Sequence, residues 1–101
     1  MRKHTKIYME AMNYTDTDFI PSEISGKPGV DVHHIIGRGK TGEDRIENLM
    51  VLTREEHVEY GDKKHHMVGL LFKHESFLKS RGINYDHQWF IDNYKKYADN
   101  N

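Results

Sequence analysis

Only two stretches of this chain have the composition of β-strands, and this limits its fold more than any other feature. Residues 30–36 are β-branched and apolar enough for a short strand, and residues 49–52 form a second apolar run of strand length. Short runs of this kind, bounded by glycine and polar residues, are typical of strands. An irregular polar loop joins the two runs. We therefore expect them to pair as a hairpin.

The remaining apolar residues recur at helical spacing. Residues 3–13 have the pattern of an amphipathic helix. Thr53, followed by Glu56 three residues later, forms a capping box that opens a helix expected to break near Gly61. Further helical patterns occupy residues 63–98. We predict an α+β fold, in which a two-stranded ββα core over about residues 22–62 is flanked by N- and C-terminal helices.

Composition narrows the class of protein further. The 101 residues are expected to form a single domain, and they include no cysteine, which excludes a disulfide framework and a thiolate zinc site. The net charge is only -1, so any contact with nucleic acid must come from local basic clusters. No stretch is apolar over the length that spans a membrane, and we expect a cytoplasmic protein without a membrane partner.

Histidines are unusually frequent and are clustered. The chain has eight, of which five occur as His33-His34, His57 and His65-His66. Taken singly, a histidine pair on a strand, an asparagine before a strand or a histidine on a helix is more often structural than functional. A hairpin with a helix across it, however, would gather the histidine pair, Asn48 and His57 around one point. Their combination predicts a functional site.

These residues resemble the HNH nucleases, also called ββα-metal nucleases. In that family a His-His or Asp-His pair opens the motif, an asparagine precedes an apolar strand, and a histidine follows nine residues after the asparagine. His33-His34, Asn48 and His57 match these residue types and spacings. The resemblance implies a metal-dependent endonuclease that hydrolyses DNA phosphodiester bonds, of the small kind common in phages and mobile elements.

The resemblance also implies a role for each residue. His33 and His57 would be ligands of one divalent metal ion, and His34 would be the general base. Asn48 would either orient His34 through its amide or join the shell of the metal. The chemistry agrees with these roles, because a divalent cation stabilises charge on the leaving oxygen, and a neutral imidazole, with a pKa near ~6.5, can take a proton from water.

One departure from the family concerns the metal ligands. Members with a histidine-rich site carry another histidine one helical turn after the position of His57, where this chain has Gly61. Asp62, His65 or a water molecule could substitute. Asp62 is disfavoured, because five residues along an α-helix turns it away from the face of His57. The sequence does not decide which metal ion is bound. Mg²⁺ or Mn²⁺ is expected, with Zn²⁺ or Ni²⁺ as alternatives that imidazole ligands favour.

A second departure concerns structural zinc. Many HNH proteins have a Cys-x-x-Cys-Gly sequence before the histidine pair, whereas this chain has Ser22 and Ser25 at the cysteine positions and Thr53 at a further one. Hydroxyl groups are poor zinc ligands compared with thiolates. We expect no structural zinc.

Basic residues between the strands are the expected DNA contacts. Arg38, Lys40 and Arg45 lie near the predicted site in chain order and are assigned to phosphate groups. Binding should therefore follow the DNA backbone, with weak sequence specificity and a steep dependence on salt. The C-terminal aromatic residues could instead stack on bases, but at helical spacing they are expected to be core; they are Trp89, Phe90, Tyr94 and Tyr97.

Two other functions compete with the nuclease. The same scaffold could be a catalytically silent module that binds DNA or protein, and Gly61 in place of a ligand favours this alternative. A histidine-rich metal-binding protein without nucleic acid is the third hypothesis, but it gives no reason for Asn48. One site per chain cuts one strand, so a nick is the expected product, and double-strand cleavage would need a homodimer or two encounters. The near-neutral net charge suggests a partner protein that delivers the substrate.

Overall fold

The computed structural model describes residues 1–37 and 42–98. Its sheet consists of β1 (Asp31–His34) and β2 (Leu49–Leu52), which pair antiparallel from Asp31 opposite Leu52 to His34 opposite Leu49. The predicted hairpin is confirmed. Its first strand is shorter than expected, because the amide of Ile36 binds the side chain of Asn48 instead of continuing the ladder.

Helices surround the hairpin, which confirms the predicted α+β class. They are α1 (Lys3–Met12), α2 (Arg54–Glu56), α3 (Met67–Ser80) and α4 (His87–Tyr97). Three shorter helical turns are the 3-10 turns η1 (Ile46–Asn48) and η3 (Lys64–His66) and the π-helical turn η2 (His57–Gly61). Within the described ranges, no helix combines the length and apolar character needed to cross a membrane.

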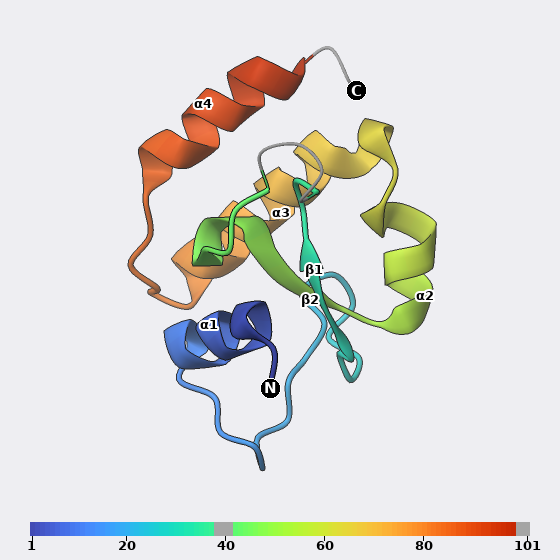
Figure 1. The fold of residues 1–101 in the computed structure, drawn as a ribbon, viewed down its shortest axis with the longest axis vertical. Helices are drawn as coiled ribbons and strands as arrows, with labels where there is room; N and C mark the ends of the chain where they lie inside the picture. Colours follow the sequence, from blue (N-terminus) through green and yellow to red (C-terminus); the bar gives the residue numbers. More distant parts are fainter. Residues whose placement is uncertain (38–41, 99–101) are drawn as a thin grey trace.

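The hairpin lies between helices on its two sides (Figure 1). Helix α1 contacts both strands, η2 contacts β1 from the opposite side, and α4 packs on α3. All four residues of β2 are buried, together with Leu71 and Leu78 of α3 and Phe90 of α4. The core therefore lies along β2 and α3. Strand β1 is less buried than β2, and its side chains can face a surface hollow.

The C-terminal aromatic residues belong to this core, as predicted. Trp89, Phe90 and Tyr97 are buried, while Tyr94 is half-buried and stacks on Phe72 with ring centroids 4.2 Å apart. Edge-to-face packing of Phe90 against Trp89 adds to the burial. They form part of the packed interior instead of an exposed platform for bases.

Hydrogen bonds tie the start of α2 to the turn before β1. Thr53 accepts a hydrogen bond from the amide of Glu56, and the Glu56 carboxylate accepts one from the amide of Thr53, so the predicted capping box is confirmed. The Ser22 hydroxyl donates to the same carboxylate and accepts from the amides of Ile24 and Ser25. Residues at the family's cysteine positions thus form a cluster around Glu56. That they bind no structural zinc stays a prediction.

Candidate functional site

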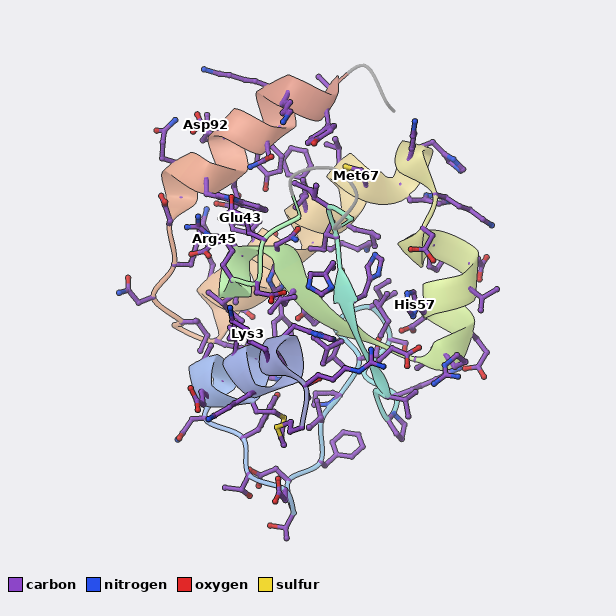
Figure 2. All side chains as sticks on the ribbon, in the orientation of Figure 1. Lys3, Glu43, Arg45, His57, Met67 and Asp92 are labelled. Carbon is purple, nitrogen blue, oxygen red and sulfur yellow. The ribbon has the colours of Figure 1, made fainter. Side chains whose placement is uncertain are left out.

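His33 and His57 come together across the edge of the hairpin. Strand β1 presents His33, η2 presents His57, and the centroids of the two rings are 4.7 Å apart. Figure 2 shows His57 on the side of its helical turn that faces the sheet. The two predicted metal ligands are therefore neighbours, although they are 24 positions apart in the sequence.

The surroundings of His33 suit a residue that binds a metal ion. It is 4% exposed, and among the described residues its Nε2 atom has no hydrogen-bond partner. A buried polar atom left unsatisfied costs about 1–3 kcal/mol, so such atoms are rare outside functional sites. Burial, with a smaller contribution from the nearby His57, lowers the pKa of His33 to about 4. The ring is consequently neutral near pH 7, which is the form that binds metal ions.

Asp62 supplies a third donor. Donor atoms of His33, His57 and Asp62 all lie within 4.8 Å of one another, with 4.0 Å between His57 Nε2 and Asp62 Oδ2. Asp62 was disfavoured on the assumption that the residues after His57 continue as an α-helix. Residues 57–61 form a π-helical turn, in which bonding runs from residue i to i+5 and brings Asp62 back to the side of His57. Inserted turns of this type occur often at functional sites.

Gly61 leaves room for this arrangement. A Cβ atom at this position would lie 2.4 Å from Cδ2 of His57 and 3.2 Å from Cε1 of His33. Any side chain would force the His57 ring to move. A histidine here, as in the histidine-rich family members, would require the rings of His57 and His33 to move, whereas the adjacent Asp62 fits beside them as they stand.

Asp31 fixes the orientation of His57. Its Oδ2 atom lies 2.9 Å from Nδ1 of His57, and Arg54 holds the same carboxylate through bonds of 2.8 and 3.0 Å. Burial tends to raise the pKa of Asp31, but hydrogen bonds from Arg54 and His57 keep it below its usual range. The ionised Asp31 accepts a hydrogen bond from the Nδ1–H group of His57, so the lone pair of His57 Nε2 faces His33 and Asp62. Sequence reasoning missed Asp31, although it stands two residues before His33 and on the same strand face.

His34 is held by Asp44 instead of Asn48. Its Nε2 atom lies 2.7 Å from Oδ1 of Asp44, and its ring centroid is 4.7 Å from that of His4 in α1. A carboxylate accepts only, so Nε2 carries the proton in this contact. Asp44 and His4 lay outside the predicted site. Asp44 could have been suspected as an acidic residue in the polar segment before Asn48.

Asn48 has a different contact from the two that were predicted. It is completely buried, and its amide bonds to the backbone N–H and C=O of Ile36 and to the C=O of Glu43. The residue joins the two ends of the loop between the strands. It supports His34 and Asp44 indirectly, because both lie close to that loop, and these bonds direct its amide to the backbone instead of to His34 or a metal.

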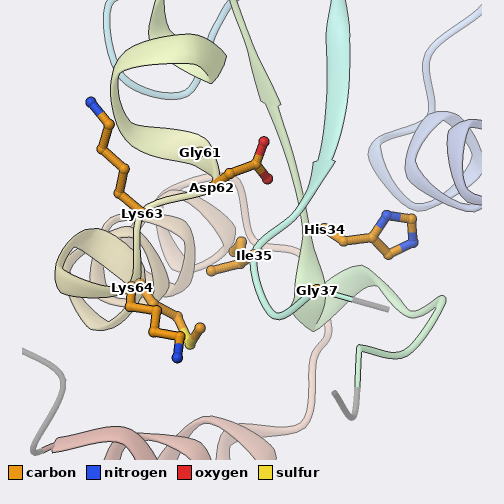
Figure 3. A pocket seen from close by; sticks show the side chains of 8 residues that line it. His34, Ile35, Gly37, Gly61, Asp62, Lys63 and Lys64 are labelled. Atoms are coloured by element: carbon orange, nitrogen blue, oxygen red, sulfur yellow. The ribbon is translucent and has the colours of Figure 1, made fainter. Parts of the chain in front are cut away.

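The histidine groups share one surface hollow. Its lining includes His33, His57 and Asp62, and also His34, His4 and the exposed Arg2. An adjoining hollow continues past the end of β1 and is lined by His34, Asp62, Lys63 and Lys64, among others. Figure 3 shows His34 on one side of this strand and Asp62 on the other. A substrate bound across the end of β1 would meet both groups.

Arg45 is engaged elsewhere. Its guanidinium lies 2.8 Å from Glu47, 3.1 Å from Glu43 and 3.4 Å from Asp86, and 5.5 Å from the centroid of the Trp89 ring. These contacts attach α4 to the loop before β2, and they argue against the predicted phosphate contact. Arg38 and Lys40 lie outside the described residues.

No protein-family model, curated protein or solved structure matches this chain. The resemblance to HNH nucleases therefore rests on its own residues and on their arrangement.

Proposed function

We propose that this chain is a metal-dependent HNH endonuclease that hydrolyses DNA phosphodiester bonds, nicking with weak sequence specificity. The observation that carries the proposal is the buried Nε2 atom of His33, which has no hydrogen-bond partner in the part of the chain that the structure describes. It lies beside His57 and Asp62, in the hollow that also contains His34. A buried nitrogen that nothing satisfies, facing two further donors, fits a cation better than a structural role.

The residues present fit a divalent metal ion. His33, His57 and Asp62 would hold it through two imidazole nitrogens and one carboxylate oxygen, with Gly61 providing the space. Such an ion would supply Lewis-acid stabilisation of charge on the phosphate and the leaving oxygen. Mixed nitrogen and oxygen donors suit Mn²⁺, Zn²⁺ and Ni²⁺, and the carboxylate reduces the disadvantage of Mg²⁺.

His34 would act as the general base. Its Nδ1 lone pair takes a proton from a water molecule as the water oxygen attacks phosphorus and the bond to the leaving 3′ oxygen breaks. The ring then becomes an imidazolium whose Nε2 proton still points to Asp44, 2.7 Å away. The carboxylate stabilises this charge and preserves the ring orientation, as an acidic partner does for a catalytic histidine in other hydrolases.

Exposed cations border the site on both sides. Arg2 lines the hollow of the histidines, and Lys63 and Lys64 line the adjoining one. Cations of this kind recognise phosphate groups without reading bases, which supports weak sequence specificity and a strong dependence on salt. They replace Arg45 as the expected backbone contacts.

The test is conversion of supercoiled plasmid to nicked circles by purified protein. Metals would be added singly after EDTA treatment, and His34→Ala would be compared with the exposed control His65→Ala. We expect metal-dependent nicking that falls by about 10²- to 10⁴-fold in His34→Ala, the range for loss of a general base. Unchanged cutting in His34→Ala would contradict the assigned base. A folded protein that cuts with none of the metals would favour the silent binding module.

A further inference from the structure

A second group of potential metal ligands lies on the other side of β1. It consists of His4 from α1, His34 from β1 and Asp44 from the segment before η1, whose donor atoms all lie within 4.8 Å of one another. His4 is buried in α1, which contacts both strands. Three different parts of the chain therefore hold these donors in place before any ion arrives.

We propose that His4, His34 and Asp44 form a second, inhibitory site for a transition-metal ion such as Zn²⁺. The inhibitory part rests on the proposed function, because it requires His34 to be the base. The site is distinct from His33, His57 and Asp62, although His4 and His34 line the same hollow as those three residues.

The donor geometry needs only a small adjustment to bind zinc. Zinc bonds to imidazole nitrogen and carboxylate oxygen are roughly 2.0–2.2 Å long, so tetrahedral ligand atoms lie roughly 3.4 Å apart. The His34 and Asp44 atoms, now 2.7 Å apart, would separate slightly, and His4 would approach them. Two imidazoles and one carboxylate favour Zn²⁺, Ni²⁺ or Co²⁺ over Mg²⁺, which prefers oxygen ligands.

Inhibition follows from the tautomer of His34. The ion would replace the proton that Nε2 donates to Asp44, and as that proton leaves to solvent the ring would take up another on Nδ1, so no net proton is released. A neutral imidazole with a metal on Nε2 carries its proton on Nδ1. The lone pair that takes the proton from water is then lost. The helix α1, which lies outside the residues that resemble HNH nucleases, thus contributes a ligand that makes the base sensitive to transition metals.

Calorimetric titration of the metal-free protein with Zn²⁺ tests the site without measuring activity. Wild type should bind two equivalents, and His4→Gln and His57→Gln should each lose one of them, with affinity for the lost equivalent reduced by roughly tenfold or more. The exposed His65→Gln is the matched control and should bind two. Circular dichroism checks that each variant is folded, and Asp44→Asn replaces His4→Gln if the latter is not.

The outcomes separate this site from the proposed metal centre. Two equivalents that persist in folded His4→Gln, or one equivalent that depends on His57 but not on His4, overturn the second site. One equivalent that disappears in His4→Gln and survives in His57→Gln supports it and contradicts the metal centre instead.

Nicking in Mn²⁺ with increasing Zn²⁺ then tests the inhibition. The Zn²⁺ concentration for half-inhibition should rise by roughly tenfold or more in His4→Gln relative to His65→Gln, in line with the lost ligand. Equal sensitivity of the two variants overturns the inhibitory role.

Discussion

Two buried histidines of this protein, His74 and His33, differ in whether their ring nitrogens have hydrogen-bond partners. His74 in α3 has both ring nitrogens occupied, with Nδ1 2.6 Å from Glu23 and Nε2 2.6 Å from the carbonyl of Ile46. His33 is nearly as buried, yet its Nε2 atom has no partner among the described residues. A buried histidine whose nitrogens are all hydrogen-bonded stabilises the fold, whereas a buried histidine with an unbonded nitrogen is suited to bind a metal ion.

The surroundings of His74 complete this contrast. Both of its nitrogens lie against oxygen atoms, one of which belongs to the fully buried carboxylate of Glu23. The other oxygen of Glu23 accepts a hydrogen bond from Tyr8 at 2.7 Å. Burial and the charge of Glu23 raise the pKa of Tyr8 above its usual range, so Tyr8 stays a donor. Each polar group here satisfies another, and nothing is left for a ligand.

The largest predicted effect is a difference in stability between matched substitutions of these histidines. His74→Leu leaves the buried Glu23 carboxylate with the Tyr8 hydroxyl but without its histidine partner, and should lower the free energy of unfolding by about 3–5 kcal/mol. His33→Leu removes an unsatisfied nitrogen, and the metal-free variant should stay within about 1 kcal/mol of wild type. Urea denaturation in EDTA measures both. Equal losses would remove the distinction between the two histidines.

Metal-dependent stabilisation sharpens the same comparison. An ion that binds only the folded protein adds about 2.7 kcal/mol at a concentration 100 times its Kd. Mn²⁺ should stabilise wild type in this way and should leave metal-free His33→Leu unchanged in thermal unfolding. His65→Leu is the control for nonspecific effects of the ion. Stabilisation of His33→Leu equal to that of wild type would place the ion at another site.

Smaller effects should come from the residues that shape the centre. Gly61→Ala places a methyl group against His57, and Asp31→Asn weakens the acceptor that orients the same ring. Each should lower Mn²⁺ affinity by about 10- to 100-fold, as loss of an outer partner does. Gly69→Ala is a suitable control, since a Cβ there meets nothing within 4 Å. Affinities of all three that match wild type would show that His57 needs no such support.

The smallest effect concerns pH and a second closed network, which surrounds Glu75. Burial tends to raise the pKa of Glu75, but hydrogen bonds from Tyr94, His87 and Tyr85 hold it below its usual range. A carboxyl with a lowered pKa in the folded state adds stability above its unfolded pKa, near ~4.3, and loses it as pH falls through the folded value. Unfolding free energies between pH 6 and 3 should therefore fall less steeply in Glu75→Gln. Parallel curves would refute this role.

Local signals account for the parts of the fold that the sequence predicted. Residues 49–52 form β2 with the expected bounds, because an apolar run between polar residues has few alternatives. Thr53 and Glu56 cap each other as expected, since a capping box needs only four residues. The meeting of His33 and His57 also followed, because a hairpin crossed by a helix brings its edge to the next helical turn.

The parts that were missed depend on tertiary contacts. Asp62 joins His57 only because the helix widens to a π turn, which no residue type specifies. His4 reaches His34 from a separate helix, and Asp44 reaches it from the far end of a loop. Arg45 was assigned to phosphate from chain order, whereas packing of α4 places Asp86 and Trp89 beside it. Distances between such elements are not encoded in a local pattern.

The central claim is that His33, His57 and Asp62 hold a catalytic metal ion. The most direct test is a crystal structure of the protein soaked in Mn²⁺, with diffraction recorded at the manganese absorption edge. The account predicts an anomalous peak bonded to Nε2 of His33, Nε2 of His57 and a carboxylate oxygen of Asp62. Full manganese occupancy at any other place, with Nε2 of His33 still unpartnered, would contradict it.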